Sequence, residues 1–402
     1  MKTLCWLFAI ATAAGSAAAE DRWYRGNTHT HSLWSDGNDF PEMIVDWYKE
    51  RGYDFIALSD HNILAVGENW MTLDAVAKRQ RTIGRRAIDK YRARFGGDWV
   101  QTRESDAGEE VRLRRIDEYR PKFEEEEKFL IIQAEEISSS SQGKPVHINA
   151  VNLPGKEIIP AVKSDAPVVE VMRENLRAVQ AREEETGQPI LAHLNHPNFQ
   201  WAITAEDLAN VVEEQFFEVY NGHPGIRHLG DEEHPGDEKI WDIANTIRLS
   251  KLDAEPLFGV ATDDSHTYHG GPVSPGRGWI MVRAESLNGD AIVRAMRAGE
   301  FYASSGVTVN SFAYTATKRL LEIEIEPVEG VTFTTQLIGT RKEHNESSIG
   351  EIIEEKTGVS LSFEVPDDVL YVRGTITSGR SHPNPSFEGQ MEQAWLQPVA
   401  WR

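Results

Sequence analysis

Short apolar segments that end in potential metal ligands recur along the first three quarters of the chain. Five of these segments are typical of buried β-strands, and each leads into histidine, aspartate or glutamate. In a parallel β/α barrel the carboxyl ends of all strands open onto one face, so these side chains are expected to converge there. The residues that the pattern places on this face are His29, His31, His61, Glu136, His196, Asp264 and His266.

The alternation of strand-like and helix-like segments predicts an α/β fold. A strand near Trp23 leads into the stretch GNTHTHSLWSDG at residues 26–37, and a helix is expected from Phe40 to Gly52. Because alternate residues of a strand face the same side, His29 and His31 can bind one metal ion together. We expect one large α/β domain over residues 20–305.

Two regions depart from this alternation. Residues 62–128 form a charged, arginine-rich insertion whose apolar residues recur near helical spacing, which predicts helices. Its exposed face is either solvated or a lid over the site that precedes it. Residues 306–402 instead alternate apolar and polar positions with a period of two, which predicts a small antiparallel β domain.

The first 19 residues have the pattern of a cleavable secretory signal peptide. Lys2 precedes an apolar run that is too short to span a bilayer, and small residues precede Glu20. We therefore expect a periplasmic or secreted protein without a membrane-spanning segment. Cys5 is the only cysteine and lies in this peptide, so the metal ligands must be His, Asp or Glu.

The formal net charge of the chain is −22, and this value limits the classes of partner. Such a field repels polyanions, so the overall charge argues against nucleic-acid binding. A small anionic substrate remains compatible if local cations shape the mouth of the site. We expect a small-molecule ester, most simply an anionic one, as the partner.

Five segments together resemble the PHP (polymerase and histidinol phosphatase) family of metallohydrolases. They are HTHSLWSDG, LSDHN, AEEIS, NHP and DDSH, in the family's order, within residues 26–302. The resemblance implies a distorted seven-stranded β/α barrel. The insertion and the C-terminal β domain lie outside the minimal pattern and resemble a secreted branch of the family.

The resemblance also implies a site for two or three divalent ions, Zn, Mn or Fe. It assigns His29, His31, Glu136 and Asp264 to one ion, Glu136, His147 and His196 to a second, and Asp36, His61 and His266 to a third. We expect the last three residues to take part in catalysis. Imidazoles with carboxylates suit these metals, and the carboxylates offset the clustered positive charge.

Adjacent strand residues face opposite sides, so only one of Glu135 and Glu136 can readily reach the ions. The family's bridging glutamate is followed by an aliphatic and then a small polar residue. This pattern matches Glu136, Ile137 and Ser138 and selects Glu136.

Several neighbouring polar residues have two interpretations each. Arg277 is the preferred anion clamp because a guanidinium binds phosphate or carboxylate in a bidentate manner. The other residues that either contact substrate or shape the loops are Asn195, Asn221, His223 and His269. Asp60 either orients His61 or caps the turn. His193 is either a core histidine or a support for the ligands.

Three functions are compatible with these residues. The leading one is an exported metal-dependent phosphoesterase that attacks with a metal-bound hydroxide. The second is the same machinery acting on a carboxylic ester, carbamate or amide. The third is a noncatalytic metal or ligand binder, which an apparently intact ligand set disfavours.

Overall fold

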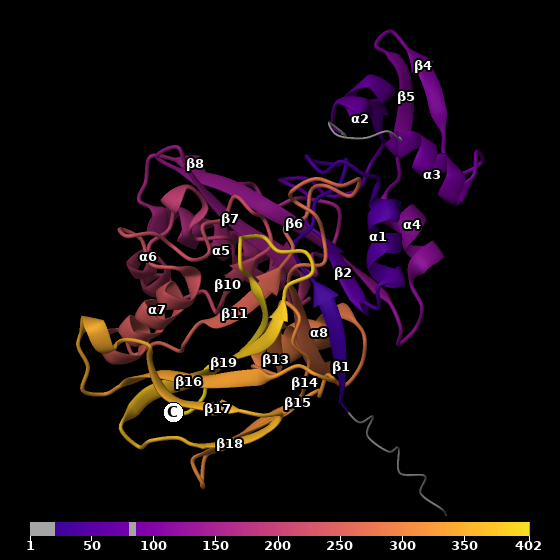
Figure 1. Ribbon diagram of the computed structural model, residues 1–402. Coiled ribbons are helices and arrows are strands. Elements are labelled where there is room, and N and C mark those ends of the chain that lie inside the picture. The colour runs from indigo at the N-terminus through magenta and orange to yellow at the C-terminus, as the bar shows by residue number, and fades with distance from the viewer. Residues whose placement is uncertain (1–20, 80–85, 402) are drawn as a thin grey trace, which may run out of the picture.

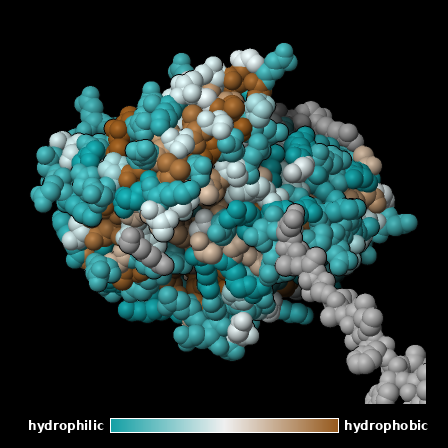
Figure 2. All heavy atoms as spheres, turned by 90° about the horizontal axis from the view of Figure 1, so that it is seen from below, coloured by the Kyte–Doolittle hydropathy of each residue, from teal (hydrophilic) through white to brown (hydrophobic). Residues whose placement is uncertain are grey.

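The computed structural model describes residues 21–79 and 86–401 (Figure 1). The predicted signal peptide and Cys5 lie outside the described residues. No helix within the described ranges combines the length and the apolar composition needed to cross a membrane. The face seen in Figure 2 is mainly hydrophilic with separate apolar areas, in keeping with the acidic composition.

One 14-stranded sheet runs through the molecule, with its main path in the order β11-β10-β9-β7-β6-β2-β1-β12-β13-β20-β19-β16-β17. Its strands are β1 (Arg22–Asn27), β2 (Phe55–Leu58), β6 (Leu130–Ser141), β7 (Lys144–Val151), β8 (Lys163–Ser164), β9 (Leu191–Leu194), β10 (Phe216–Asn221), β11 (Phe258–Thr262), β12 (Trp279–Ala284), β13 (Phe301–Ser304), β16 (Phe333–Arg341), β17 (Glu351–Thr357), β19 (Val369–Ser381) and β20 (Met391–Leu396). The fold is therefore mixed α/β around a large sheet, as the sequence predicts.

Helices connect the strands of the first part of the sheet. They are α1 (Pro41–Glu50), α5 (Val168–Thr186), η1 (Phe199–Trp201), α6 (Ala205–Asn210), α7 (Asp237–Lys251) and α8 (Gly289–Arg297). Their ends follow local sequence signals. Pro41 occupies the first turn of α1, Thr204 and Asp207 form a capping box before α6, and Gly187 ends α5 with a φ of 71°.

Strand pairing does not close this sheet into the predicted seven-stranded barrel. β1, β2 and β6 run parallel, but β7 forms an antiparallel hairpin with β6 and also pairs antiparallel with β9. On its other edge β1 pairs antiparallel with β12, which continues into β13. Among the described residues, β1 and β11 are joined through one isolated bridge, Thr30 with Ser265, beyond their carboxyl ends.

The C-terminal strands extend the same sheet, because β20 pairs antiparallel with β13. A second sheet in this region has three strands, β14 (Val309–Thr315), β15 (Leu320–Ile325) and β18 (Ser360–Glu364), and the short η2 (Glu346–Ser348) precedes β17. Trp395 of β20 is fully buried and stacks on Tyr220 of β10 with ring centroids 5.5 Å apart. The core is thus continuous between the two parts.

A buried ion pair also joins the C-terminal region to α7. Arg373 of β19 donates to both carboxylate oxygens of Asp242, at 2.8 and 2.7 Å, and to Glu238 at 3.0 Å. Tyr371 donates its hydroxyl to Asp242 at 2.7 Å. Bidentate guanidinium–carboxylate geometry is among the strongest polar contacts in proteins, so this cluster fixes β19 against α7.

The insertion is not purely helical, which corrects the prediction for residues 62–128. Its described residues, 62–79 and 86–128, form a three-stranded antiparallel sheet in the order β3-β5-β4 and three helices. The elements are β3 (Asn69–Thr72), α2 (Leu73–Arg79), α3 (Ala87–Phe95), β4 (Thr102–Ser105), β5 (Gly108–Leu113) and α4 (Ile116–Phe123). Gly108 begins β5 directly after the turn from β4, and its φ of 108° suits glycine. Helical spacing in the sequence does not detect this turn.

The insertion projects from the body beside α1 (Figure 1). It packs on the loop that carries the first ligand motif. Phe40 stacks on Tyr91 with centroids 4.0 Å apart, and Trp34 donates its indole N–H to the carbonyl of Arg114 at 3.2 Å. Residues 32–40 therefore lie between the insertion and the sheet.

Candidate metal centre

Backbone contacts beyond the strand ends bring the expected ligands together. His61, after β2, and Glu136, within β6, form a parallel bridge, and the Thr30–Ser265 bridge joins the segments after β1 and β11. The amide of Asp264 donates to the carbonyl of His29 at 2.9 Å. All nine predicted ligands consequently meet in one cluster.

The first set, His29, His31, Glu136 and Asp264, is deeply buried. His29 Nε2 lies 3.3 Å from both Glu136 Oε1 and Asp264 Oδ1. His31 Nε2 lies 3.2 Å from Asp264 Oδ1 and 3.7 Å from Glu136 Oε2. The two imidazoles therefore face the same two carboxylates.

Glu136 is the centre of the second set. Its Oε1 lies 3.0 Å from His147 Nδ1 and 3.4 Å from His196 Nε2, and its Oε2 lies 2.5 Å from His61 Nδ1. Potential ligand atoms of His61, Glu136 and His147 all lie within 4.8 Å of one another. His61 thus borders the second set as well as its predicted third set.

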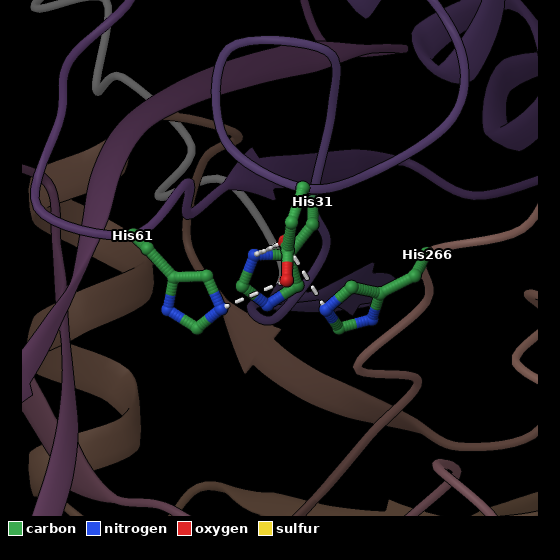
Figure 3. A group of neighbouring side chains, drawn as sticks. His31, His61 and His266 are labelled. Carbon is green, nitrogen blue, oxygen red and sulfur yellow. Dashed lines mark ion pairs between the residues drawn. The ribbon is translucent and has the colours of Figure 1, made fainter. Parts of the chain in front are cut away.

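The third set gathers around Asp36, with His31 added to it. His61 and His266 flank His31 at ring-centroid distances of 4.4 and 4.1 Å (Figure 3). Asp36 lies 3.5 Å from His61 Nε2, 3.3 Å from His266 Nε2 and 3.6 Å from His31 Nδ1. These four residues offer ligand atoms within 4.8 Å of one another, so His31 lies between two sets.

Glu135 and Glu136 point to opposite sides of β6. Glu136 faces the histidines, whereas Glu135 accepts a hydrogen bond from the amide of Ile159 at 2.5 Å. Burial raises the pKa of Glu135 to about 7. Burial also opposes ionisation of Glu136, but His61, His147 and His29 together hold its pKa well below the usual range.

The other carboxylates of the cluster are ionised for the same reason. Burial disfavours their charge, yet His29 and His31 hold the pKa of Asp264 well below its usual range, and His266 and His61 do the same for Asp36. Burial and the neighbouring His266 lower the pKa of His31 to about 3. His31 is therefore neutral. Burial opposes protonation of His29 and His266, yet the carboxylates raise the pKa of both, and a bound metal ion would displace those protons.

Glu218 of β10 supports one of the ligands, and the sequence motifs did not identify it. It is fully buried, accepts from Asn221 and from the backbone amide of His196, and lies 2.6 Å from His29 Nδ1. A carboxylate that holds the second nitrogen of a ligating histidine fixes the tautomer and orientation of the ring. The available signal was a lone acidic residue within the buried strand FFEVYN.

The residues with two interpretations are now placed. Asp60 holds the turn after His31, accepting from Ser32 and from Ser35, so it caps that turn. His193 is buried and lies 3.1 Å from the Thr28 hydroxyl, inside the strand layer. Asn195 donates to Glu136 at 2.9 Å and therefore supports a ligand.

Arg277 does not line the cavity, which argues against its predicted role as an anion clamp. It is 4% exposed, and its guanidinium donates to the carbonyls of Gly222, Pro272 and Asn384. Burial lowers its pKa. Arg277 therefore ties the loop after β11 to the C-terminal region.

The other two predicted substrate contacts are also used by the protein itself. The His269 side chain lies 2.7 Å from Lys90 of the insertion and 3.3 Å from Asp39, away from the ligand cluster. Asn221 donates to Glu218 and to Asp264 Oδ2 at 3.1 Å, so it orients a ligand. Loop contacts of this kind leave no trace in residue type or spacing.

Backbone strain marks two of the ligand segments. His196 has a φ of 28° and Asp264 a φ of 45°, values that non-glycine residues adopt only at a cost. Such strain persists where the surroundings over-determine it, typically at functional sites.

A cavity of about 280 Å³ opens onto the cluster. Its lining consists of Asp36, His61, Glu136, His147, His196, Phe199, His223, Ile226, Asp264, His266 and Val273. The volume is near the lower end of the range of small-molecule sites, about 300–1,000 Å³.

The residues present fit divalent cations. His29 Nε2 and His31 Nε2 are buried, have no hydrogen-bond partner and face Asp264. Unpaired buried polar atoms are costly, and a cation between them and the carboxylates would remove that cost. Nitrogen and carboxylate donors together suit Zn, Mn or Fe.

Comparisons with known protein families and with curated proteins found no match. Solved structures do include similar chains. A two-domain protein from Bacteroides vulgatus, described as containing a predicted PHP-like metal-dependent phosphoesterase, is 15% identical, with 94% of this chain and 95% of that chain covered and a TM-score of 0.40.

Two further structures are similar over a shorter part. A candidate metal-dependent phosphoesterase from Bifidobacterium adolescentis is 12% identical, covering 61% of this chain and 88% of its own, with a TM-score of 0.29. An amidohydrolase from Chromobacterium violaceum, with bound sulfate and no metal, is 12% identical, covering 62% and 93%, with a TM-score of 0.29.

Proposed function

We propose that this protein is a metal-dependent hydrolase that acts on a small phosphate ester. The observation that carries the proposal is the convergence of four buried ligands, His29, His31, Glu136 and Asp264, in which both imidazole Nε2 atoms have no hydrogen-bond partner. Divalent ions bound there would lower the pKa of water and stabilise the negative charge that develops on the ester.

The protein's own residues hold this arrangement in place. Glu218 orients His29, and Asn195 and Asn221 orient Glu136 and Asp264. Among the described residues that line the cavity there is no serine, cysteine, threonine or lysine, and its carboxylates are assigned to the metal ions, so the proposed nucleophile is water. Hydrolysis forms a bond from the water oxygen to phosphorus and breaks the ester P–O bond, and the leaving oxygen takes up a proton.

A carboxylic ester, carbamate or amide is the second candidate. It is favoured by the absence of arginine and lysine from the described cavity lining, since a dianionic phosphate ester usually meets a cation. Inhibition by phosphate or vanadate distinguishes a phosphoesterase from this alternative.

The test begins with metal analysis of the purified protein, followed by chelation, reconstitution and assays of phosphomonoesters, phosphodiesters and carboxylic esters. We expect ester hydrolysis that rises with bound metal and that is lost, together with the metal, in the His29→Ala/His31→Ala double variant. Near-normal hydrolysis and metal content in this variant would contradict the proposal. Stoichiometric metal with no turnover of any ester would indicate a noncatalytic binder.

We also propose that the protein is exported, which the residues from Lys2 to Ala19 support. Mass spectrometry of the protein from its native cells is expected to find a mature chain that begins at Glu20. A cytoplasmic chain that retains Met1 would contradict this.

A further inference from the structure

Part of the cavity wall remains unexplained after the ligands are assigned. It is formed by Phe199 of η1, by His223 and Ile226 of the loop after β10, and by Val273 of the loop after β11. Three of these four side chains are apolar. We call Phe199, Ile226 and Val273 the apolar wall.

Contacts to the ligand segments fix the position of the apolar wall. The Phe199 ring packs edge-on against His196, with centroids 5.2 Å apart at 71°. The carbonyl of Val273 accepts hydrogen bonds from the amides of His266 and Thr267, at 3.0 and 2.9 Å. Ile226 is 8% exposed, and its amide donates to the carbonyl of His223 at 3.0 Å. The wall is thus preformed beside the metal centre.

The part of the cavity away from the ligands offers, in its described lining, no fixed cation for a second anionic group on the substrate. The described cavity lining contains Asp36, Glu136 and Asp264 but no lysine or arginine. Arg277 is the nearby cation, and it is already engaged by three carbonyl oxygens. Beyond the scissile ester, an anion or a polyol would therefore lose hydration and find, apart from His223, no polar side chain of the described lining outside the ligand set.

His223 supplies a hydrogen-bond donor at the same wall. Its Nδ1 accepts from the amide of Gly225 at 2.8 Å, so the neutral ring carries its proton on Nε2. Nε2 has no protein partner within residues 21–79 and 86–401. Asn221 accepts from the His223 amide at 2.8 Å and donates to Asp264, which couples the donor to the ligand set.

We propose that the apolar wall holds the uncharged, apolar organic group of the ester, and that His223 donates Nε2–H to an oxygen of the same substrate. This proposal rests on the proposed hydrolase function and adds its substrate class. An aryl or short alkyl ester fits it, whereas a sugar ester, a nucleotide or a polyphosphate does not.

The first test compares phenyl and glyceryl esters of phosphate and, in parallel, of acetate, using the metal-loaded full-length protein. Ile226→Ala is expected to lower kcat/KM for the phenyl ester roughly tenfold and to change the glyceryl value little, because the lost contacts are to the apolar group alone. Leu229→Ala is the matched control, since Leu229 lies on the same loop and is 68% exposed. Equal losses on both esters, or a preference for the glyceryl ester, would overturn the proposal.

A second test separates this proposal from the hydrolase function because it needs no turnover. Calorimetry is expected to show tighter binding of phenylphosphonate than of methylphosphonate to the metal-loaded protein, and Ile226→Ala is expected to remove the difference. Equal binding of the two phosphonates by the wild type would overturn the subsite even if esters are hydrolysed. Absence of hydrolysis together with selective phenylphosphonate binding would overturn the hydrolase function alone.

The donor role of His223 has its own variants. His223→Ala is expected to weaken phenylphosphonate binding roughly tenfold, and His223→Gln to restore much of it, because the glutamine amide places a donor near the Nε2 position. His234→Ala, on the same loop but outside the cavity lining, is the control. If the alanine and glutamine variants bind phenylphosphonate as the wild type does, His223 is not a substrate donor.

Discussion

The ligand cluster and the contact between α7 and β19 both bury several charges, but they differ in how completely those charges are paired. At the α7–β19 contact, Arg373 meets both oxygens of Asp242 and also Glu238, and Tyr371 completes the set. In the ligand cluster, His29 and His31 leave buried nitrogens without hydrogen bonds. A fully paired buried cluster joins parts of the fold, whereas an incompletely paired one is suited to a ligand.

The largest expected effect separates the two glutamates of β6. Glu136→Gln is expected to lose bound metal and to lower turnover by more than about a hundredfold, because it removes the anion that faces His61, His147 and His196. Glu135→Gln carries the same change one residue earlier and is expected to keep its metal. Metal analysis of both variants is the measurement, and the reverse pattern would contradict the observed orientation of β6.

The next effect concerns the paired cluster. Arg373→Met is expected to lower the free energy of unfolding by about 3–5 kcal/mol, because it leaves the buried Asp242 carboxylate without its cationic partner. Arg341→Met removes two exposed ion pairs, to Glu351 and Asp368, and is expected to cost at most about 1 kcal/mol. Denaturant unfolding measures both, and metal content should stay unchanged in each. Equal small effects would show that burial does not distinguish the two pairs.

Replacement of Arg277 tests whether this residue stabilises the fold or binds substrate. Arg277→Met is expected to lower the free energy of unfolding by about 2 kcal/mol, because the carbonyls of Gly222, Pro272 and Asn384 lose their donor. KM for a phosphate ester should stay the same. An increased KM with unchanged stability would instead support the anion clamp expected from the sequence.

The last effect is a pH dependence of stability, expected at Glu214, a buried carboxyl outside the ligand cluster. Burial raises the pKa of Glu214 to about 8, although the amides of Phe216 and Gln215 donate to it. Between the unfolded pKa near 4.5 and this value, the folded state retains a proton that the unfolded state releases, so stability falls as pH rises.

Glu214→Gln is therefore expected to remove a slope of up to about 1.4 kcal/mol per pH unit over that window and to be relatively more stable toward pH 8. Glu213→Gln, at the exposed neighbouring position, is the control. Urea unfolding at several pH values between 5 and 8 measures the slopes. Parallel pH profiles for wild type and Glu214→Gln would contradict the proton uptake.

The sequence predicted the parts of the fold that depend on local pattern. Strand periodicity and strand-end ligands placed His29, His61 and Asp264 together because parallel strands share one edge. Capping signals set the start of α6 and the end of α5. The course of the sheet beyond β12 depended on pairing between residues about ninety apart in the chain, and no local signal encodes it.

The site could be predicted as a set of residue types but not as a set of contacts. Arg277 and His269 are residue types that often contact substrate, yet each is directed into the protein by a partner distant in the chain, Asn384 and Lys90 respectively. The sequence did not single out Glu218, because its strand has the apolar composition of a buried core strand. Its role appears only when His29 is placed beside it.

The pairing of β20 with β13 makes the ligand cluster depend on a distant part of the chain. The sheet that supports the metal centre receives one of its inner strands from residues 391–396. Asn384 also forms hydrogen bonds with Ser274 and Arg277, and these bonds hold the loop on which Val273 lies. A chain that stops before Asn384 has neither contact. The ligand cluster therefore depends on residues 384–396 for part of its support, far along the chain from the ligands themselves.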